Sequence, residues 1–207
     1  MALTLTKGQN LSLTKTDPDM KKAMLGLGWD ARSTDGTEFD LDASAILVGA
    51  DGKVRSDDDF VFYNQMGDVT LPAPAPGKPA PFDPAKASVM YQGDNRTGDG
   101  DGDDEQVLVD FDRIPSEIER VVFTVSIYDA ERRAQNFGQV RNAFIRLVND
   151  STGTEIVRYD LTEDYYSETS LIFAEVYRNG GEWKFRAVGQ GYRDGLGGIA
   201  REFGVNI

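Results

Sequence analysis

The amino-acid sequence predicts an all-β protein: a two-sheet β-sandwich of about ten strands with a few short helices. Apolar residues alternate with polar ones in several segments, as in residues 121–127, whose odd-numbered positions are all Val, Phe or Ile. Turn sequences rich in Asn, Asp and Gly follow such segments at residues 149–153 and 179–181. Many short strands joined by tight turns bury their apolar faces most readily as two packed sheets.

The individual elements follow from the same patterns. The two turns predict hairpins between residues 144–148 and 156–161, and between residues 171–177 and 182–187. Helical segments are few, and we expect them at residues 131–137 and 196–203, the second with Asp194 as N-cap. The remaining strands are expected at residues 3–6, 11–14, 24–31, 41–48, 60–64, 106–111 and 121–127.

We expect one domain over residues 1–207, with a proline-rich loop at residues 71–84. Six of the eight prolines lie in that segment, which favours an extended connection between two strands. The strands that precede it are too few to close a sandwich alone.

Composition excludes several classes of function. The 207 residues include no Cys and no His, so disulfides, thiolate nucleophiles, Ser-His-Asp triads and zinc or iron–sulfur sites with such ligands are excluded. The formal charge of −13 disfavours direct binding to nucleic acid or to an anionic membrane. No apolar run approaches the roughly 20 residues of a membrane span, and residues 1–13 lack an apolar signal-peptide core. We therefore expect a cytoplasmic protein without direct membrane insertion.

The most informative motif is the acidic, glycine-rich segment at residues 93–105. Its four glycines let the backbone fold tightly, so carbonyl oxygens can converge together with carboxylates. Two unit charges about 6 Å apart repel by roughly 3 kcal/mol at the effective dielectric of a protein surface. The segment therefore either stays extended in solvent or closes around a cation, and Ca²⁺ takes six to eight oxygen ligands of this kind. Its six acids are Asp94, Asp99, Asp101, Asp103, Asp104 and Glu105.

A second acidic cluster lies upstream. Asp40 and Asp42 share one face of the strand expected there, while Phe39, Leu41 and Ala43 share the other. Together with the acidic segment, these two carboxylates predict a divalent-cation site at one end of the sandwich. The spacing does not fit an EF-hand, because Asp104 stands where that loop requires Gly.

Other readings remain open at this point. Glu168, in a third acidic stretch, either reaches the ion or caps a turn. Asp30 and Asp129 follow strand ends, where each either joins the site or starts a turn. A hydrolase that uses Asp40 and Glu105 as acid and base, or to hold a metal, is the alternative function. An acidic surface that binds basic partners by charge alone is a lesser one.

The chain resembles the TerD family of bacterial tellurium-resistance and stress proteins over nearly its whole length. The strongest match is residues 93–98 continuing to 103–105. Further matching segments are residues 7–8, 11–13, 26–30, 39–44, 137–140, 159–161 and 183–185.

This resemblance implies a calcium-binding β-sandwich without established catalytic activity, with a role in tolerance to tellurite and other chemical stress. It implies other tellurium-resistance proteins as partners, among them an integral membrane protein at the inner face of the membrane. We expect two Ca²⁺ ions. The family's acidic positions correspond to Asp40, Asp42, Asp94, Asn95, Asp103, Asp104 and Glu105. Spacing and position add three to the expected metal ligands: Asp99, Asp101 and Glu168.

Overall fold

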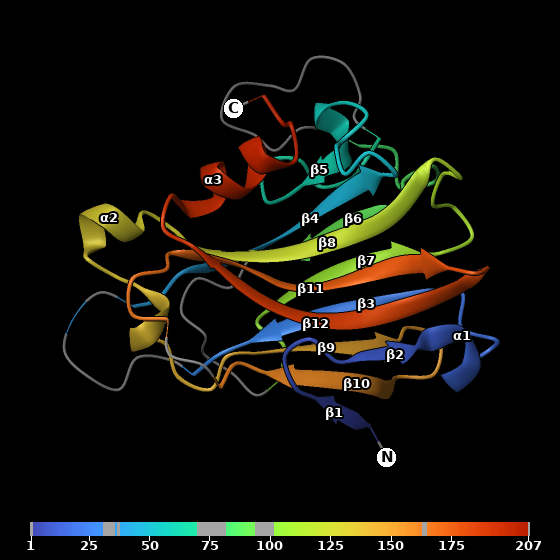
Figure 1. Ribbon diagram of the computed structural model, residues 1–207, viewed down its shortest axis with the longest axis horizontal. Coiled ribbons are helices and arrows are strands. Elements are labelled where there is room, and N and C mark those ends of the chain that lie inside the picture. The colour runs from blue at the N-terminus through green and yellow to red at the C-terminus, as the bar shows by residue number, and fades with distance from the viewer. Residues whose placement is uncertain are drawn as a thin grey trace.

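Two six-stranded sheets pack face to face in the computed structural model (Figure 1). It describes residues 2–30, 36, 38–69, 82–93, 102–162 and 165–206. Sheet A has the strand order β1-β10-β9-β3-β7-β6 and sheet B the order β2-β12-β11-β8-β4-β5. The prediction of a two-sheet sandwich is confirmed.

The strands of sheet A are β1 (Leu3–Leu5), β3 (Lys22–Gly28), β6 (Val89–Gly93), β7 (Glu105–Asp110), β9 (Phe144–Asn149) and β10 (Thr154–Asp160). Those of sheet B are β2 (Asn10–Ser12), β4 (Leu41–Gly49), β5 (Phe60–Val61), β8 (Ile118–Ile127), β11 (Ser170–Asn179) and β12 (Glu182–Tyr192). Three α-helices, α1 (Leu13–Thr16), α2 (Ala130–Arg133) and α3 (Gly195–Glu202), and two 3-10 turns, Asp57–Asp59 and Phe137–Gln139, complete the described elements.

Within the sheets the pairing is antiparallel except for β1, which runs parallel to β10. Both expected hairpins form, β9 with β10 and β11 with β12. β4 is hydrogen-bonded along its length to β8, but its other edge pairs with β5 only at Ala45 and Ile46. The backbone groups of β4 that precede Ala45 therefore need partners from outside sheet B.

Three local predictions were wrong. The strand expected at residues 11–14 ends at Ser12, because the Ser12 hydroxyl accepts a hydrogen bond from the Lys15 N–H and caps α1. The helix expected at residues 131–137 is interrupted: α2 ends at Arg133, Ala134 adopts a positive φ of 50°, and a separate 3-10 turn begins at Phe137. The strand β6 was missed, because it follows directly on the proline-rich segment. Residues 71–81 of the expected loop lie outside the described residues.

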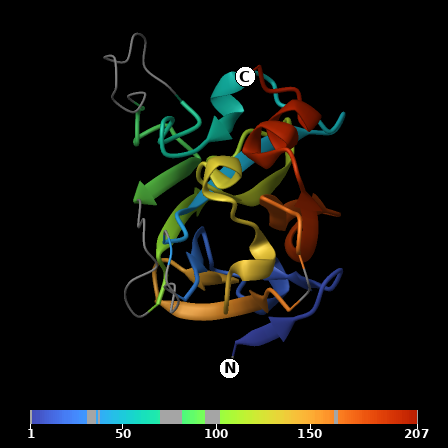
Figure 2. The ribbon, with the colours of Figure 1, turned by 90° about the vertical axis from the view of Figure 1, so that its left-hand side faces the viewer.

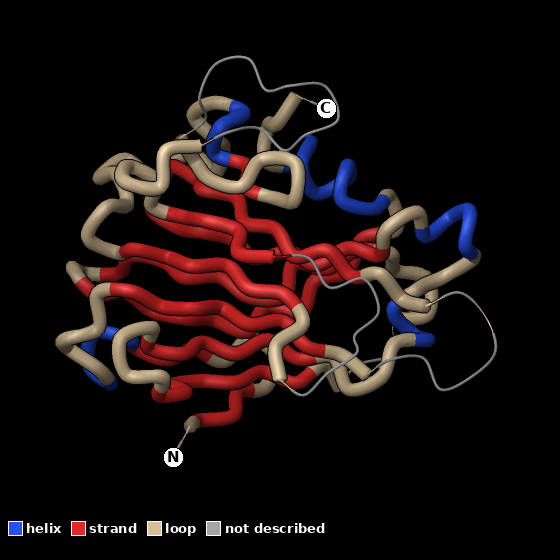
Figure 3. Tube along the Cα trace, turned by 180° about the vertical axis from the view of Figure 1, so that it is seen from behind, coloured by secondary structure: helices blue, strands red, loops and turns tan. Residues whose placement is uncertain are grey.

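Two apolar clusters hold the layers together. The larger fills the space between the sheets and includes Trp29, Phe173 and Phe185, while Trp183 packs against it partly buried. The smaller lies on the outer face of sheet B, where α3 covers Ile46 and neighbouring residues of β8 and β11. In Figure 3, which faces sheet A, the described helices lie around the rim and none crosses the outer face of that sheet.

Candidate metal-binding end of the sandwich

Glu105 connects the end of the acidic, glycine-rich segment to the strand that follows Asp40 and Asp42. This residue begins β7 in sheet A and is only 1% exposed. Its Oε2 accepts a hydrogen bond from the backbone N–H of Ala43 on β4 of sheet B, on the edge of β4 that β5 leaves unpaired. Its Oε1 accepts a hydrogen bond from the Tyr91 hydroxyl on β6, 2.5 Å away. Glu105 thus joins the acidic segment that ends with it to the segment of Asp40 and Asp42.

Asp104 fixes the same segment to the end of β3. Its backbone N–H donates to the carbonyl of Leu27 at 2.8 Å, and its Oδ2 accepts from the backbone N–H of Trp29 at 2.9 Å. Leu27 and Trp29, two positions apart on the same chain segment, therefore both bond to Asp104. The contact between β3 and β7 thus extends one residue beyond Glu105, the last paired residue of β7. One oxygen of the Asp104 carboxylate therefore already accepts a hydrogen bond from the protein backbone.

Asp103 lies on the outer face of sheet A in an ion pair with Arg146 of β9. The Arg146 Nε and Nη2 donate to the two Asp103 oxygens at 2.7 and 3.1 Å, and the side chain of Asp103 is 4% exposed. Arg146 also donates to Glu155 at 3.0 Å. These hydrogen bonds raise the pKa of the Arg146 guanidinium. Gly26 of β3 lies directly beneath, where a Cβ would stand 2.0 Å from the Asp103 Cγ.

Asp40 and Asp42 lie on the face opposite the core residues Phe39 and Leu41, as predicted, and both are buried. The Asp40 carboxylate is 3.5 Å from Nη2 of Arg133, and its backbone carbonyl accepts from the Tyr128 N–H. Asp42 stands opposite Ser126 of β8.

Glu168 belongs to a different environment. Its oxygens accept two hydrogen bonds from Ser167, both at 3.0 Å, and Arg193 lies 3.9 Å away. The hydrogen bond from the Ser167 N–H is the main cause of its lowered pKa. Its side chain packs over Gly191 of β12, where a Cβ would meet it at 2.4 Å. The turn interpretation therefore accounts for its contacts.

The other acids singled out by the sequence contact donors of the protein itself. Asp30 accepts a hydrogen bond from the Asn142 side chain at 2.5 Å, while Asp129 precedes α2 and pairs with Arg132. Both start turns.

Four predicted ligands, Asp94, Asn95, Asp99 and Asp101, lie outside the described residues. Across the ranges that the structure covers, no three Asp or Glu side chains gather closely enough to hold a metal ion. The donors at this end are carboxylate and carbonyl oxygens, which is the ligand chemistry of Ca²⁺ rather than of softer metals. Figure 2 shows this end of the sandwich, with α2 facing the viewer.

Sequence reasoning missed the residues that hold the acids. Nothing in the sequence distinguishes Arg146 from the other basic residues of the chain. Tyr91 lies in β6, the strand that the patterns did not predict. The Gly26-Leu27-Gly28 spacing was the available signal, because glycines within a strand often mark the close approach of another segment. A Cβ at Gly28 would meet the Phe144 ring at 2.4 Å and the Gly102 carbonyl at 2.6 Å.

Among the described residues, no helix is long and apolar enough to cross a membrane.

Known proteins resemble the chain in sequence and in fold. It is 52% identical to the tellurium resistance protein TerD of Serratia marcescens over 206 residues, covering 100% of this chain and 99% of that protein. It is 46% identical to general stress protein 16U of Bacillus subtilis over 208 residues, all of both chains. A crystal structure of a telluride resistance protein (TerD) homologue from Streptomyces coelicolor A3(2) matches with a TM-score of 0.62 at 23% identity, over 87% of this chain and 95% of that one. That likeness supports the fold.

The model of the family described as TerD domain matches residues 1–203. With the full-length identity to tellurium resistance protein TerD, this match places the protein: it belongs to the TerD domain family of tellurium-resistance and stress-response proteins.

Proposed function

We propose that this protein acts in tellurium resistance and the stress response as a non-enzymatic, calcium-binding sensor or scaffold. The observation that carries the proposal is the hydrogen bond between the Ala43 N–H and Glu105, which holds the Asp40–Asp42 segment beside the end of the acidic, glycine-rich segment. This bond joins two acidic stretches whose bonded residues are 62 positions apart in sequence.

We divide the predicted ligands by role. Asp103 and Glu105 have protein donors on both of their oxygens, so we assign them to bracing the loop. Asp40, Asp42 and Asp104 remain the described candidates for holding Ca²⁺, together with Asp94, Asn95, Asp99 and Asp101. Bound Ca²⁺ would supply positive charge that offsets repulsion among these carboxylates.

A binding function accounts for Glu105 better than hydrolysis does. A general acid or base needs a carboxylate that reaches substrate. Glu105 is 1% exposed and bonded to Ala43 and Tyr91, so substrate has no access to it. The relatives named above are resistance and stress proteins, which agrees with this choice.

We further propose that calcium orders the acidic end for contact with other tellurium-resistance proteins, including an integral membrane protein at the inner face of the membrane. The chain itself would remain cytoplasmic. Ordering of loops by an ion gives a binding surface that exists only in the loaded state.

Calorimetric titration with Ca²⁺ tests the proposal. We expect heat on Ca²⁺ addition to protein stripped of divalent ions, and a rise in melting temperature that a chelator reverses. At a free ion level 100-fold above Kd, the linked stabilisation is about 2.7 kcal/mol. The Asp99→Asn/Asp101→Asn variant should keep the apo melting temperature and lose most of the calcium affinity.

The matched control is Glu119→Gln/Asp150→Asn. Both acids are exposed, and the variant removes the same charge away from the acidic end. Equal loss of affinity in both variants would mean that calcium responds only to net charge, and absence of binding in the unmodified protein would refute the proposal outright.

A further inference from the structure

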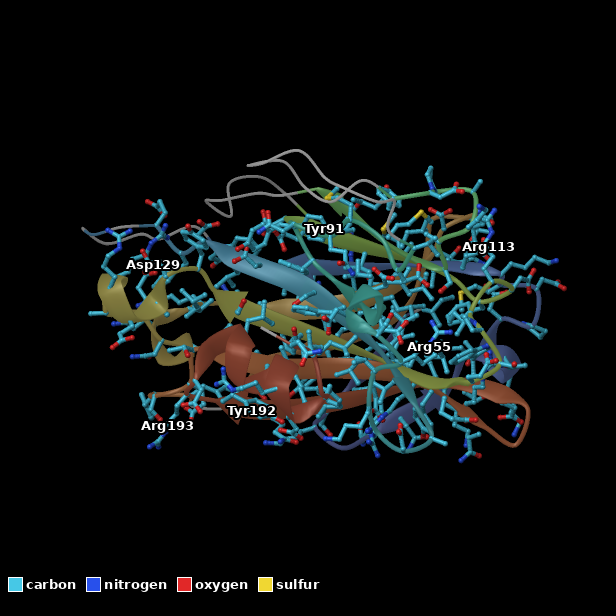
Figure 4. The ribbon with its side chains drawn as sticks, turned by 90° about the horizontal axis from the view of Figure 1, so that it is seen from above. Arg55, Tyr91, Arg113, Asp129, Tyr192 and Arg193 are labelled. Carbon is cyan, nitrogen blue, oxygen red and sulfur yellow. The ribbon has the colours of Figure 1, made fainter. Side chains whose placement is uncertain are left out.

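A second site lies on the outer face of sheet B, in a cleft of about 710 Å³ between α2 and the start of α3. Figure 4 shows Asp129 and Arg193 at the same end of the molecule, and both line this cleft. We call it the α2–α3 cleft. Its lining residues are Asp42, Tyr63, Ser126, Ile127, Asp129, Glu131 and Thr169, with Tyr128, Ala130 and the run from Arg193 to Leu196. It shares only Asp42 with the calcium ligands proposed above.

The floor of the cleft contains the hydroxyl of Ser126. Asp42, Ser126 and Ser170 stand side by side across β4, β8 and β11, so their side chains share the outer face. Ser126 lines the cleft, is only 5% exposed, and its hydroxyl has no hydrogen-bond partner among the residues that the structure describes. Ser170, behind it, is fully buried and does not line the cleft. The Ser126 hydroxyl is therefore the one that a molecule bound in the cleft can reach among the described residues of this row.

The charges of the residues that line the cleft favour binding of a cation. Four carboxylates line the cleft, those of Asp42, Asp129, Glu131 and Asp194, and Arg193 is the one cationic residue among the described lining residues. Arg132 pairs with Asp129, which still leaves an excess of negative charge. A concave surface lined with one sign of charge concentrates ligands of the opposite sign.

The size and the aromatic lining point to an organic cation. The cleft is far larger than one metal ion, and its carboxylates form no group that could coordinate a metal within the described part of the chain. The Tyr128 ring already receives the Arg133 guanidinium at 5.1 Å, which shows that the ring is placed to interact with a cation. Ile127 and Leu196 add apolar surface that methylene groups can cover.

We propose that the α2–α3 cleft binds primary alkylammonium groups. Asp42, Glu131 and Asp194 supply the compensating charge, and Ser126 accepts a hydrogen bond from an ammonium. The same chemistry has two sources, a free aliphatic polyamine or lysine side chains of a protein partner. Binding of either one requires no calcium, and because Asp42 is also a proposed calcium ligand, the site is tested on protein without divalent ions.

Titration followed by amide chemical shifts tests the proposal on the full chain after removal of divalent ions. Spermidine and the blocked peptide acetyl-Lys-Lys-Lys-amide are the two probes, at fixed ionic strength. We expect saturable shifts at the amides of Ser126, Ala130 and Leu196. Tighter binding of spermidine would identify a free polyamine as the ligand, and tighter binding of the peptide would identify lysines of a partner.

Three variants sharpen the test. Glu131→Gln/Asp194→Asn should weaken spermidine binding at least tenfold, and Ser126→Ala should weaken it several-fold. Arg193→Gln should strengthen binding, because it removes the positive charge that competes with the ligand. The control Glu119→Gln/Asp150→Asn removes as much negative charge elsewhere and should leave the affinity unchanged.

Two results would overturn the proposal. One is an equal loss of affinity in the cleft variant and in the control, which would mean attraction to the protein's net charge alone. The other is the absence of saturable shifts with both probes. Hexane-1,6-diol, an uncharged chain with hydroxyl ends, should produce none of these shifts.

Discussion

The carboxylate of Asp103 occupies the space above Gly26 that a side chain on β3 would otherwise fill. The Cβ of any other residue at position 26 would stand 2.0 Å from the Asp103 Cγ and 2.2 Å from each of its oxygens. Glycine at this position therefore lets the end of the acidic segment lie flat on sheet A, within reach of Arg146.

Replacement of Gly26 by alanine should displace Asp103 and weaken its pair with Arg146. We expect a loss of about 1–3 kcal/mol in the free energy of unfolding, as for other overpacked sites. Urea denaturation measures it. Gly93→Ala is the control, because a Cβ there has no atom of the described residues within 4 Å. Equal destabilisation by both variants would show that the contact with Asp103 is unimportant.

The Asp103–Arg146 pair should contribute to stability whether or not calcium is present. A double-mutant cycle with Asp103→Asn and Arg146→Gln should give a coupling energy of about 1–2 kcal/mol, because the Asp103 end of the pair is almost completely buried. The cycle is measured by urea denaturation with chelator and again with saturating Ca²⁺. A coupling that vanishes on calcium addition would instead make Asp103 an ion ligand.

Glu105→Gln should destabilise the junction between the sheets. Glutamine replaces one of the two accepting carboxylate oxygens by an NH2 donor and removes the negative charge that strengthens the bonds from the Ala43 N–H and the Tyr91 hydroxyl. We expect a loss of about 1–3 kcal/mol in the free energy of unfolding. Tyr91→Phe removes only one of the two hydrogen bonds and should cost less. A larger loss for Tyr91→Phe than for Glu105→Gln would contradict this account of the junction.

The sequence predicted the fold well where local patterns decide it. Alternation and turn residues located the β9–β10 and β11–β12 hairpins, because the strands of each hairpin are neighbours in sequence. The prediction failed at residues 11–14, where the apolar-polar alternation indicated a strand. The Ser12 side chain instead caps a helix at residues 13–16.

The candidate site was predictable in its acids but not in their partners. The Asp40 and Asp42 face follows from strand periodicity, which needs no knowledge of other segments. The pairing of Asp103 with Arg146, 43 positions away, depends on sheet A placing β9 beside β3. The argument from charge repulsion therefore overstated the need for a bound cation at Asp103, because the Arg146 guanidinium already pairs with the Asp103 carboxylate.

Glu182 should make part of the stability depend on pH. It begins β12, and its oxygens contact Lys15 Nζ at 2.9 Å and the Ser12 hydroxyl at 3.0 Å, which lowers its pKa from the ordinary 4.5. A carboxyl whose pKa is lower in the folded state stabilises the fold above its unfolded pKa, and this contribution disappears as the pH falls through its folded pKa. Glu182→Gln should therefore lower the urea midpoint at pH 7 and make little difference at pH 2.5.

The control for this pH dependence is Glu119→Gln, which changes an exposed residue of β8. Its urea midpoint should follow that of the unmodified protein between pH 7 and pH 2.5, because Glu119 makes no ion pair or side-chain hydrogen bond with a described residue. The urea midpoint of Glu182→Gln could instead stay below that of the unmodified protein by the same amount from pH 7 to pH 2.5. That result would mean that the glutamine alters packing near α1. The loss would then not arise from the charge that Glu182 presents to Lys15.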